Sequence, residues 1–119
     1  MFLKGRVMLK KISLLGATGS IGIQTVDILR NNKDSFQLVA LSSGKNIEKT
    51  REIIDDLQPE LVSVQQEQDA IQLQKEYPHI HFTFGTKGLV EVATHSDSTV
   101  LVNAVLGSVG LESTLAAIR

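Results

Sequence analysis

Apolar residues along this chain fall into two alternating patterns, short continuous runs and longer segments with helical spacing. The runs predict buried strands at residues 12–15, 36–41, 61–64, 80–84 and 99–105. The segments of helical period predict helices at about residues 20–32, 47–57, 67–77 and 85–94. A further helix should follow the turn at Gly107–Gly110, with Leu111, Leu115 and Ile118 on one face. Such alternation predicts an α/β fold, a Rossmann-like doubly wound parallel sheet in three layers.

The most informative segment is the glycine-rich turn between the first strand and the first helix, which reads GATGSIG from Gly16 to Gly22. In a phosphate-binding turn, Gly16 permits the tight bend and Gly19 lets the backbone approach a pyrophosphate. Gly22 lets the helix pack against the strand. The helix N-terminus offers N–H groups without internal partners and the positive end of its dipole. An ordinary strand–turn–helix is the alternative, but the position of the motif favours nucleotide binding.

The end of the second strand indicates which dinucleotide would bind. An acidic residue there accepts from the ribose 2′-OH of NAD, whereas it would repel the 2′-phosphate of NADP. The segment from Ser42 to Asn46 reads SSGKN and holds hydroxyls, a lysine and an amide, but no acid. It therefore favours NADP. The segment also fits a plain polar loop in which Asn46 caps the following helix, and the two interpretations are compatible.

Length and composition narrow the function classes. The chain has 119 residues, which suits one domain, and its formal net charge of −1 gives no reason to expect a nucleic-acid or acidic-membrane partner. It has no cysteine, which excludes disulfides and thiolate chemistry and is compatible with a reducing cytosol. No apolar run approaches the ~20 residues of a membrane span. Residues 1–9 are expected to be an N-terminal extension, and Met8 is a possible alternative translation start.

Three segments together resemble the 1-deoxy-D-xylulose 5-phosphate reductoisomerase family. They are GATGSIG, the loop Gly44-Lys45-Asn46, and the C-terminal run NAVLGSVGLESTLAAIR. The likeness covers residues 10–119. It implies that Thr18, Gly19, Ser20 and Ile21 bind the cofactor phosphates and that Gly44, Lys45 and Asn46 bind the adenosine phosphate. Gly107 would flank the nicotinamide, as a weaker correspondence.

The resemblance also implies an activity and a domain arrangement. Enzymes of this family rearrange 1-deoxy-D-xylulose 5-phosphate and reduce the product with NADPH to 2-C-methyl-D-erythritol 4-phosphate, in non-mevalonate isoprenoid biosynthesis. They need Mg²⁺, Mn²⁺ or Co²⁺ and work as cytoplasmic homodimers. Residues 10–119 would be the NADPH-binding Rossmann-like domain, truncated before the catalytic domain, because the family's catalytic and metal-binding residues come later in its chains. We therefore expect no catalytic or metal-binding residue here, and an inactive fragment that ends inside a helix.

The chain has three histidines, of which two are candidate metal ligands. His79 and His81 are two residues apart, so on a strand they would face the same side and could share a metal. No third ligand is evident, and exposed strand histidines without a metal are the more ordinary interpretation. His95 stands in a polar turn and is expected to be solvated.

The remaining polar candidates also have ordinary explanations. Asp55, Asp56, Glu48 and Glu52 are expected to form a solvated helix face, since adjacent carboxylates cannot both point into one cleft. Asn103, near the end of the fifth strand, could line a cofactor crevice or make a plain strand-end hydrogen bond, and both possibilities stay open.

Two functions from different classes fit the sequence. The first is the cofactor-binding part of an NADPH-dependent oxidoreductase, and a semialdehyde dehydrogenase is a variant that would need a catalytic cysteine elsewhere. The second is a non-catalytic dinucleotide-binding regulatory module. The residues that follow such a domain would distinguish them, because the reductoisomerase needs clustered carboxylates and a lysine–glutamate pair.

Overall fold

The computed structural model describes residues 9–104 of the chain. Strands and helices alternate along this range, as the hydrophobic pattern predicted. No helix within residues 9–104 is both long enough and apolar enough to cross a membrane. The elements are β1 (Lys10–Leu15), α1 (Ser20–Arg30), β2 (Phe36–Ser42), α2 (Ile47–Leu57), β3 (Leu61–Val64), α3 (Glu67–Glu76), β4 (His81–Phe84), α4 (Gly85–Ala93) and β5 (Val100–Asn103).

The strands form one parallel sheet in the order β4-β3-β2-β1-β5. The order runs outward from β1 in one direction through β4 and then returns to place β5 on the other side of β1. The register sets Leu15 of β1 beside Asn103 of β5, and Ser42 of β2 beside Ser63 of β3. The carboxyl ends of the strands therefore meet at one edge of the sheet, which is where ligands bind in open α/β folds.

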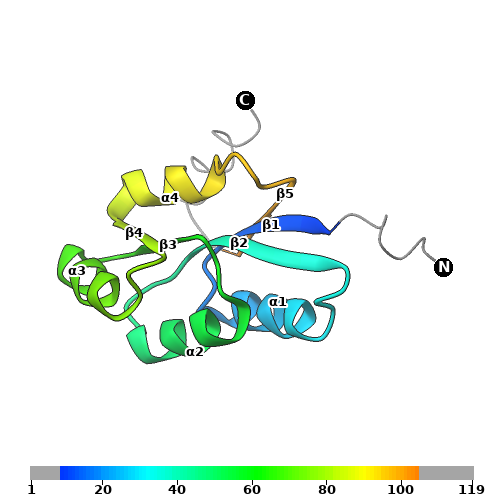
Figure 1. Cartoon of the computed structure of the whole chain (residues 1–119), viewed down its shortest axis with the longest axis horizontal. Coiled ribbons are helices and arrows are strands. Elements are labelled where there is room, and N and C mark those ends of the chain that lie inside the picture. The colour runs from blue at the N-terminus through cyan, green and yellow to red at the C-terminus, as the bar shows by residue number, and fades with distance from the viewer. Residues whose placement is uncertain (1–8, 105–119) are drawn as a thin grey trace.

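Helices cover both faces of the sheet, so the three-layer Rossmann-like prediction is confirmed. In Figure 1, α4 lies over one face and α1 and α2 lie under the other. Leu14 of β1 packs with Val26 of α1 and Ile53 of α2 in one buried cluster. Leu15 packs with Val92 of α4 in a second cluster on the opposite face. Successive residues of β1 thus enter different cores, as the alternation of side chains along a strand requires.

Most predicted boundaries hold to within two residues. The helix at residues 85–94 exists as α4 and ends one residue earlier. α1 ends at Arg30 rather than at residue 32, because the Asn32 side chain donates to the Ile28 carbonyl at 2.7 Å and closes the helix end. β1 begins two residues earlier than predicted, at Lys10, which pairs with Phe36. The predicted turn at Gly107–Gly110 and the helix after it lie outside the described residues.

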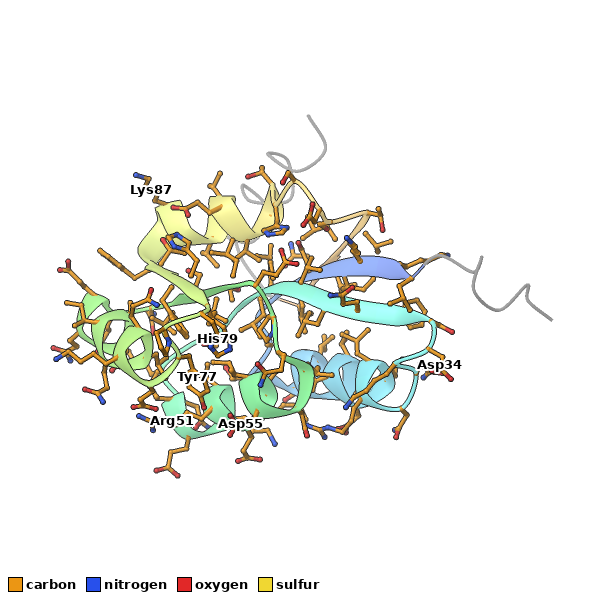
Figure 2. The ribbon with its side chains drawn as sticks, in the orientation of Figure 1. Asp34, Arg51, Asp55, Tyr77, His79 and Lys87 are labelled. Carbon is orange, nitrogen blue, oxygen red and sulfur yellow. The ribbon has the colours of Figure 1, made fainter. Side chains whose placement is uncertain are left out.

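A two-point ion pair joins α2 to α3 on the outer side of the molecule. The Nε and Nη2 atoms of Arg51 each donate to a carboxylate oxygen of Glu76 at 2.8 Å. Figure 2 shows Arg51 beside Tyr77 and Asp55 in this region. The hydrogen bonds from Arg51, with one from Gln72, lower the pKa of Glu76 from 4.5 to about 2. The folded protein therefore favours the ionised carboxylate.

This pair predicts a measurable loss of stability in acid. A carboxyl group with a lowered pKa stabilises the fold above its ordinary pKa, and the contribution disappears as the pH falls from about 4.5 towards about 2. Arg51 and Glu76 keep 35% and 30% of their side chains exposed, so we expect about 1 kcal/mol rather than the full equivalent of the shift. When urea unfolding is measured at several acidic pH values, the free energy of unfolding should fall less steeply with decreasing pH for Glu76→Gln than for the parent. Arg51→Gln should behave like Glu76→Gln, and parental acid dependence in both variants would contradict the assignment.

Candidate dinucleotide-binding site

A cleft of about 590 Å³ opens at the carboxyl ends of the strands. Its walls come from the ends of β2 and β3, from the residues that follow β1, β2, β3 and β5, and from the first half of α4. None of the described residues that line it carries a charge. They are Gly16, Thr18, Gly19, Ser42, Ser43, Gly44, Val64, Gln65, Gly85, Thr86, Leu89 and Ala104.

The glycine turn after β1 has the geometry that the sequence predicted. Gly16 adopts φ +80°, a left-handed conformation that side chains disfavour, and Gly19 N–H donates to its carbonyl at 3.3 Å. Gly22 lies against the turn so closely that an added Cβ would stand 2.7 Å from the Ala17 carbonyl carbon and closer still to the Gly16 oxygen. The predicted roles of Gly16 in the bend and of Gly22 in packing are confirmed.

The N-terminus of α1 opens beside the cleft and has no side-chain cap. Gly19 is the N-cap residue, with φ −80° and ψ 175°, and it offers no side-chain oxygen to the first N–H groups of the helix. Ser20 and Ile21 begin the helix with exposed side chains, and Ile21 is 53% exposed. These N–H groups and the helix dipole are suited to bind an anion.

The end of β2 is tied to the glycine turn by three hydrogen bonds. The Ser42 hydroxyl accepts from Gly16 N–H at 2.9 Å, and the Ser42 carbonyl accepts from Ala17 N–H at 2.8 Å. Gly44 N–H donates to the Thr18 hydroxyl oxygen at 3.2 Å. The two segments that the sequence singled out, 18–21 and 44–46, therefore lie side by side.

Lys45 and Asn46 follow as exposed residues at the start of α2. The Asn46 side-chain oxygen accepts from Lys49 N–H at 3.1 Å, so the predicted helix cap is confirmed. That bond occupies the oxygen and leaves the side-chain N–H groups of Asn46 able to donate. Lys45 supplies a positive charge close to a cleft whose walls are neutral.

Gly19 and Gly44 are not required as glycines by the fold itself. A Cβ on Gly19 would meet only the Gly16 oxygen at 3.7 Å, and one on Gly44 only the Thr18 hydroxyl oxygen at 3.7 Å. These are ordinary van der Waals distances. The space that a side chain would fill at these positions lies at the cleft, where a ligand could approach the backbone, and this fits a bound dinucleotide.

The far wall of the cleft was missed from the sequence. Val64 ends β3, Gln65 follows it, and Gly85, Thr86 and Leu89 belong to the first half of α4. The rule that ligands lie at the carboxyl ends of strands could have pointed to them once the order of the strands was known. Val64 and Leu89 contribute apolar surface to this wall, and Gln65 and Thr86 contribute neutral polar groups.

Asn103 and Gly107 are the candidate cofactor-site residues nearest the C-terminus. Ala104 lines the cleft at the end of β5, whereas the neighbouring Asn103 is not among the lining residues and has an interaction within the fold. Both roles that the sequence left open for Asn103 stay predictions. Gly107 lies outside the described residues.

His79 and His81 do not form a shared metal site. His79 lies in the turn before β4 rather than on the strand, and its Nε2 is 3.2 Å from Gln58 Oε1. His81 begins β4, and its Nε2 is 3.8 Å from a carboxylate oxygen of Glu91 on α4. The shared side that a strand would give the two residues does not arise, because β4 begins only at His81.

The prediction that His95 is solvated is wrong. Its side chain is only 16% exposed and lies 3.5 Å from Glu60 through Nε2. Its Nδ1 accepts from Asp97 N–H at 3.3 Å. The side chains of Glu60, His95 and Asp97 place potential metal-ligand atoms within 4.8 Å of one another. Both ring nitrogens already have protein partners, and these bonds account for the cluster as a support for the loop before β5.

The acidic residues of α2 lie on an exposed face, as predicted. Asp55 accepts from the Tyr77 hydroxyl at 2.8 Å, and Asp56 pairs with Arg30 at 2.7 Å. Burial of the Tyr77 ring and this hydrogen bond raise the pKa of Tyr77 to about 12. These carboxylates join helices to one another and do not line the cleft.

Comparison with known proteins identifies the family. The sequence profile described as 1-deoxy-D-xylulose 5-phosphate reductoisomerase matches residues 12–119. The chain belongs to the 1-deoxy-D-xylulose 5-phosphate reductoisomerase family. It is 78% identical over 111 residues to the reductoisomerase of Lysinibacillus sphaericus strain C3-41, and 56% identical over 111 residues to that of Listeria welshimeri. Each alignment covers 93% of this chain and 29% of the relative. The chain thus spans less than a third of the length of these reductoisomerases.

Solved reductoisomerases share the fold. The enzyme from Zymomonas mobilis in complex with NADPH matches with a TM-score of 0.85 and 28% identity, over 94% of this chain and 30% of that one. A reductoisomerase in complex with NADPH, fosmidomycin and magnesium matches with a TM-score of 0.84 and 29% identity, over 92% of this chain and 28% of that one. The Rossmann-like sheet described above is therefore a fold found in this family.

Proposed function

We propose that this chain is the NADPH-binding domain of a 1-deoxy-D-xylulose 5-phosphate reductoisomerase. The observation that carries the proposal is the cleft at the carboxyl ends of the strands, where an uncapped helix N-terminus lies beside a loop that has a lysine and no acid. The NADPH complexes of similar reductoisomerases support it. Membership of an enzyme family favours this function over a non-catalytic regulatory module.

The residues around α1 would hold the pyrophosphate. Thr18, Gly19, Ser20 and Ile21 form the turn and the first residues of the helix, where N–H groups and the helix dipole favour negative charge. The open space at Gly19 would let a phosphate approach the backbone directly. The exposed Ile21 side chain would cover one side of the bound cofactor.

The loop after β2 would hold the 2′-phosphate of the adenosine. Gly44 lines the cleft, Lys45 provides a charge that can pair with the phosphate, and Asn46 retains its side-chain N–H donors. A charge-assisted hydrogen bond is roughly twice as strong as one between neutral groups. This loop would therefore give the preference for NADPH over NADH.

The complete reaction is proposed for the longer protein that such a domain forms in its relatives. That protein would convert 1-deoxy-D-xylulose 5-phosphate to 2-C-methyl-D-erythritol 4-phosphate and would act as a homodimer. A divalent metal ion, of which magnesium is present in similar structures, would be held by residues outside this chain. In this account, residues 10–119 bind and orient NADPH and do not turn over the substrate alone.

Titration of the 119-residue chain with NADPH and NADH tests the proposal. We expect NADPH to bind at least ~10-fold more tightly, because a charge-assisted hydrogen bond contributes about 1.5–3 kcal/mol. Lys45→Ala should remove most of this preference by weakening NADPH binding alone. Lys10→Ala is the matched control, because Lys10 is an exposed lysine at the opposite end of β1, and it should leave both affinities unchanged. Equal affinities for the two cofactors, or none for either, would contradict the proposal.

A further inference from the structure

Thr18 lies between the two loops that face the cleft. It belongs to the glycine turn after β1, and its hydroxyl oxygen accepts from Gly44 N–H at 3.2 Å in a partly buried position. A threonine hydroxyl has one donor hydrogen and two acceptor positions. The bond to Gly44 uses one of the acceptor positions.

The other hydrogen bonds between the glycine turn and the end of β2 do not reach the loop at residues 44–46. Both remaining bonds run from the glycine turn to Ser42, which still belongs to β2. They fix the glycine turn against the sheet and do not involve the segment beyond the strand. Within residues 9–104, no other hydrogen bond ties Gly44 or Lys45 to the glycine turn. The loop is anchored at one end by Ser43 N–H, which donates to the Ser63 carbonyl at 2.8 Å, and at the other by Asn46, which caps α2. Between these ends, the Thr18 hydroxyl fixes Gly44 against the glycine turn.

We propose that Thr18 is a positioning residue that sets the 2′-phosphate loop, residues 44–46, at a fixed distance from the pyrophosphate turn. This inference rests on the proposed function and extends it to the origin of cofactor selectivity. Without the hydroxyl, Gly44 N–H loses its partner in a partly buried place, and the loop adopts other positions to satisfy it. The Ser42 bonds keep the pyrophosphate turn in place. Loss of the hydroxyl thus weakens NADPH binding more than NADH binding.

A double-mutant cycle between Thr18 and Lys45 tests this coupling. Thr18→Val replaces the hydroxyl by a methyl group of similar size, and Thr18→Ser keeps the hydroxyl. Thr18→Ala removes the same hydroxyl with less bulk, and serves if circular dichroism shows that Thr18→Val is unfolded. Affinities for NADPH and NADH are measured for each variant with and without Lys45→Ala, in the 119-residue chain.

Thr18→Val should lower NADPH affinity about 10-fold and NADH affinity about 2-fold or less, whereas Thr18→Ser should resemble the parent. Lys45→Ala should cost about 10-fold in NADPH affinity in the parent, but only about 2-fold when Thr18 is valine. Equal losses for both cofactors in Thr18→Val, or a Lys45→Ala effect that is the same in both backgrounds, would overturn the positioning role. Absence of NADPH binding by the parent would instead refute the proposed function.

Discussion

Gly19→Val should abolish dinucleotide binding while the domain stays folded. Gly19 has φ −80° and ψ 175°, which is an extended conformation that valine readily adopts. Its Cβ would stand 3.7 Å from the Gly16 oxygen, so the protein itself has room for it. The two additional methyl groups would occupy the space over the first N–H groups of α1. A pyrophosphate would then lose its backbone contacts, and we expect NADPH affinity to fall by about 100-fold or more.

The stability cost of this substitution should be small. Glycine is a better N-cap residue than valine, and the difference is about 1 kcal/mol. Circular dichroism and urea unfolding should therefore show a folded domain, and an NADPH titration should show no saturable binding. Gly19→Ala is the intermediate variant, and its affinity should fall between those of the parent and Gly19→Val. Parental NADPH affinity in a folded Gly19→Val would show that the phosphate turn has been assigned wrongly.

Gly22→Ala should instead destabilise the fold severely. An alanine in place of a glycine within a helix ordinarily stabilises it by about 0.5–1 kcal/mol. At Gly22 the added carbon would overlap the backbone of the glycine turn, 2.7 Å from the Ala17 carbonyl carbon and 2.8 Å from its Cα. Backbone atoms cannot move aside as the end of a side chain can. We expect a loss of about 3 kcal/mol or more, which is at the upper end for overpacked sites.

Urea unfolding of Gly22→Ala beside Gly19→Ala isolates this effect. Both variants add the same methyl group to the same turn, but only position 22 lacks the space for it. Gly19→Ala should unfold near the parental midpoint, whereas Gly22→Ala should unfold at a much lower urea concentration or fail to fold. A stabilised Gly22→Ala would mean that α1 does not pack against the turn as described.

The sequence predicted the order and type of the described elements because each has a strong local signal. The strands are short and mostly apolar runs, and the helices between them have apolar residues at helical spacing. The glycine turn was predictable for the same reason. Gly16 and Gly22 serve backbone geometry and close packing, which act over a few residues of chain.

Features that depend on contacts between distant segments could not be predicted in this way. His95 was expected to be solvated, but Glu60, far away in the sequence, lies 3.5 Å from it. His79 and His81 would share a side only on one strand, but His79 lies in the turn before β4 and contacts Gln58, a distant residue in the sequence. The order of strands in the sheet brings Gly44 beside Thr18. The same order places Gln65 and Thr86 in the cleft wall. A sequence shows that order only indirectly.

The most direct test of the account is residue-resolved mapping of NADPH on the 119-residue chain by NMR. Backbone amide signals are assigned and followed as NADPH is added. We expect the largest shifts at residues 18–21 and 44–46, with smaller shifts at Gln65 and Thr86 on the far wall of the cleft. Signals at the opposite end of the sheet, such as Lys10 and His95, should stay in place. Shifts centred on that opposite end, or none in the glycine turn, would contradict the assignment of this cleft as the NADPH site.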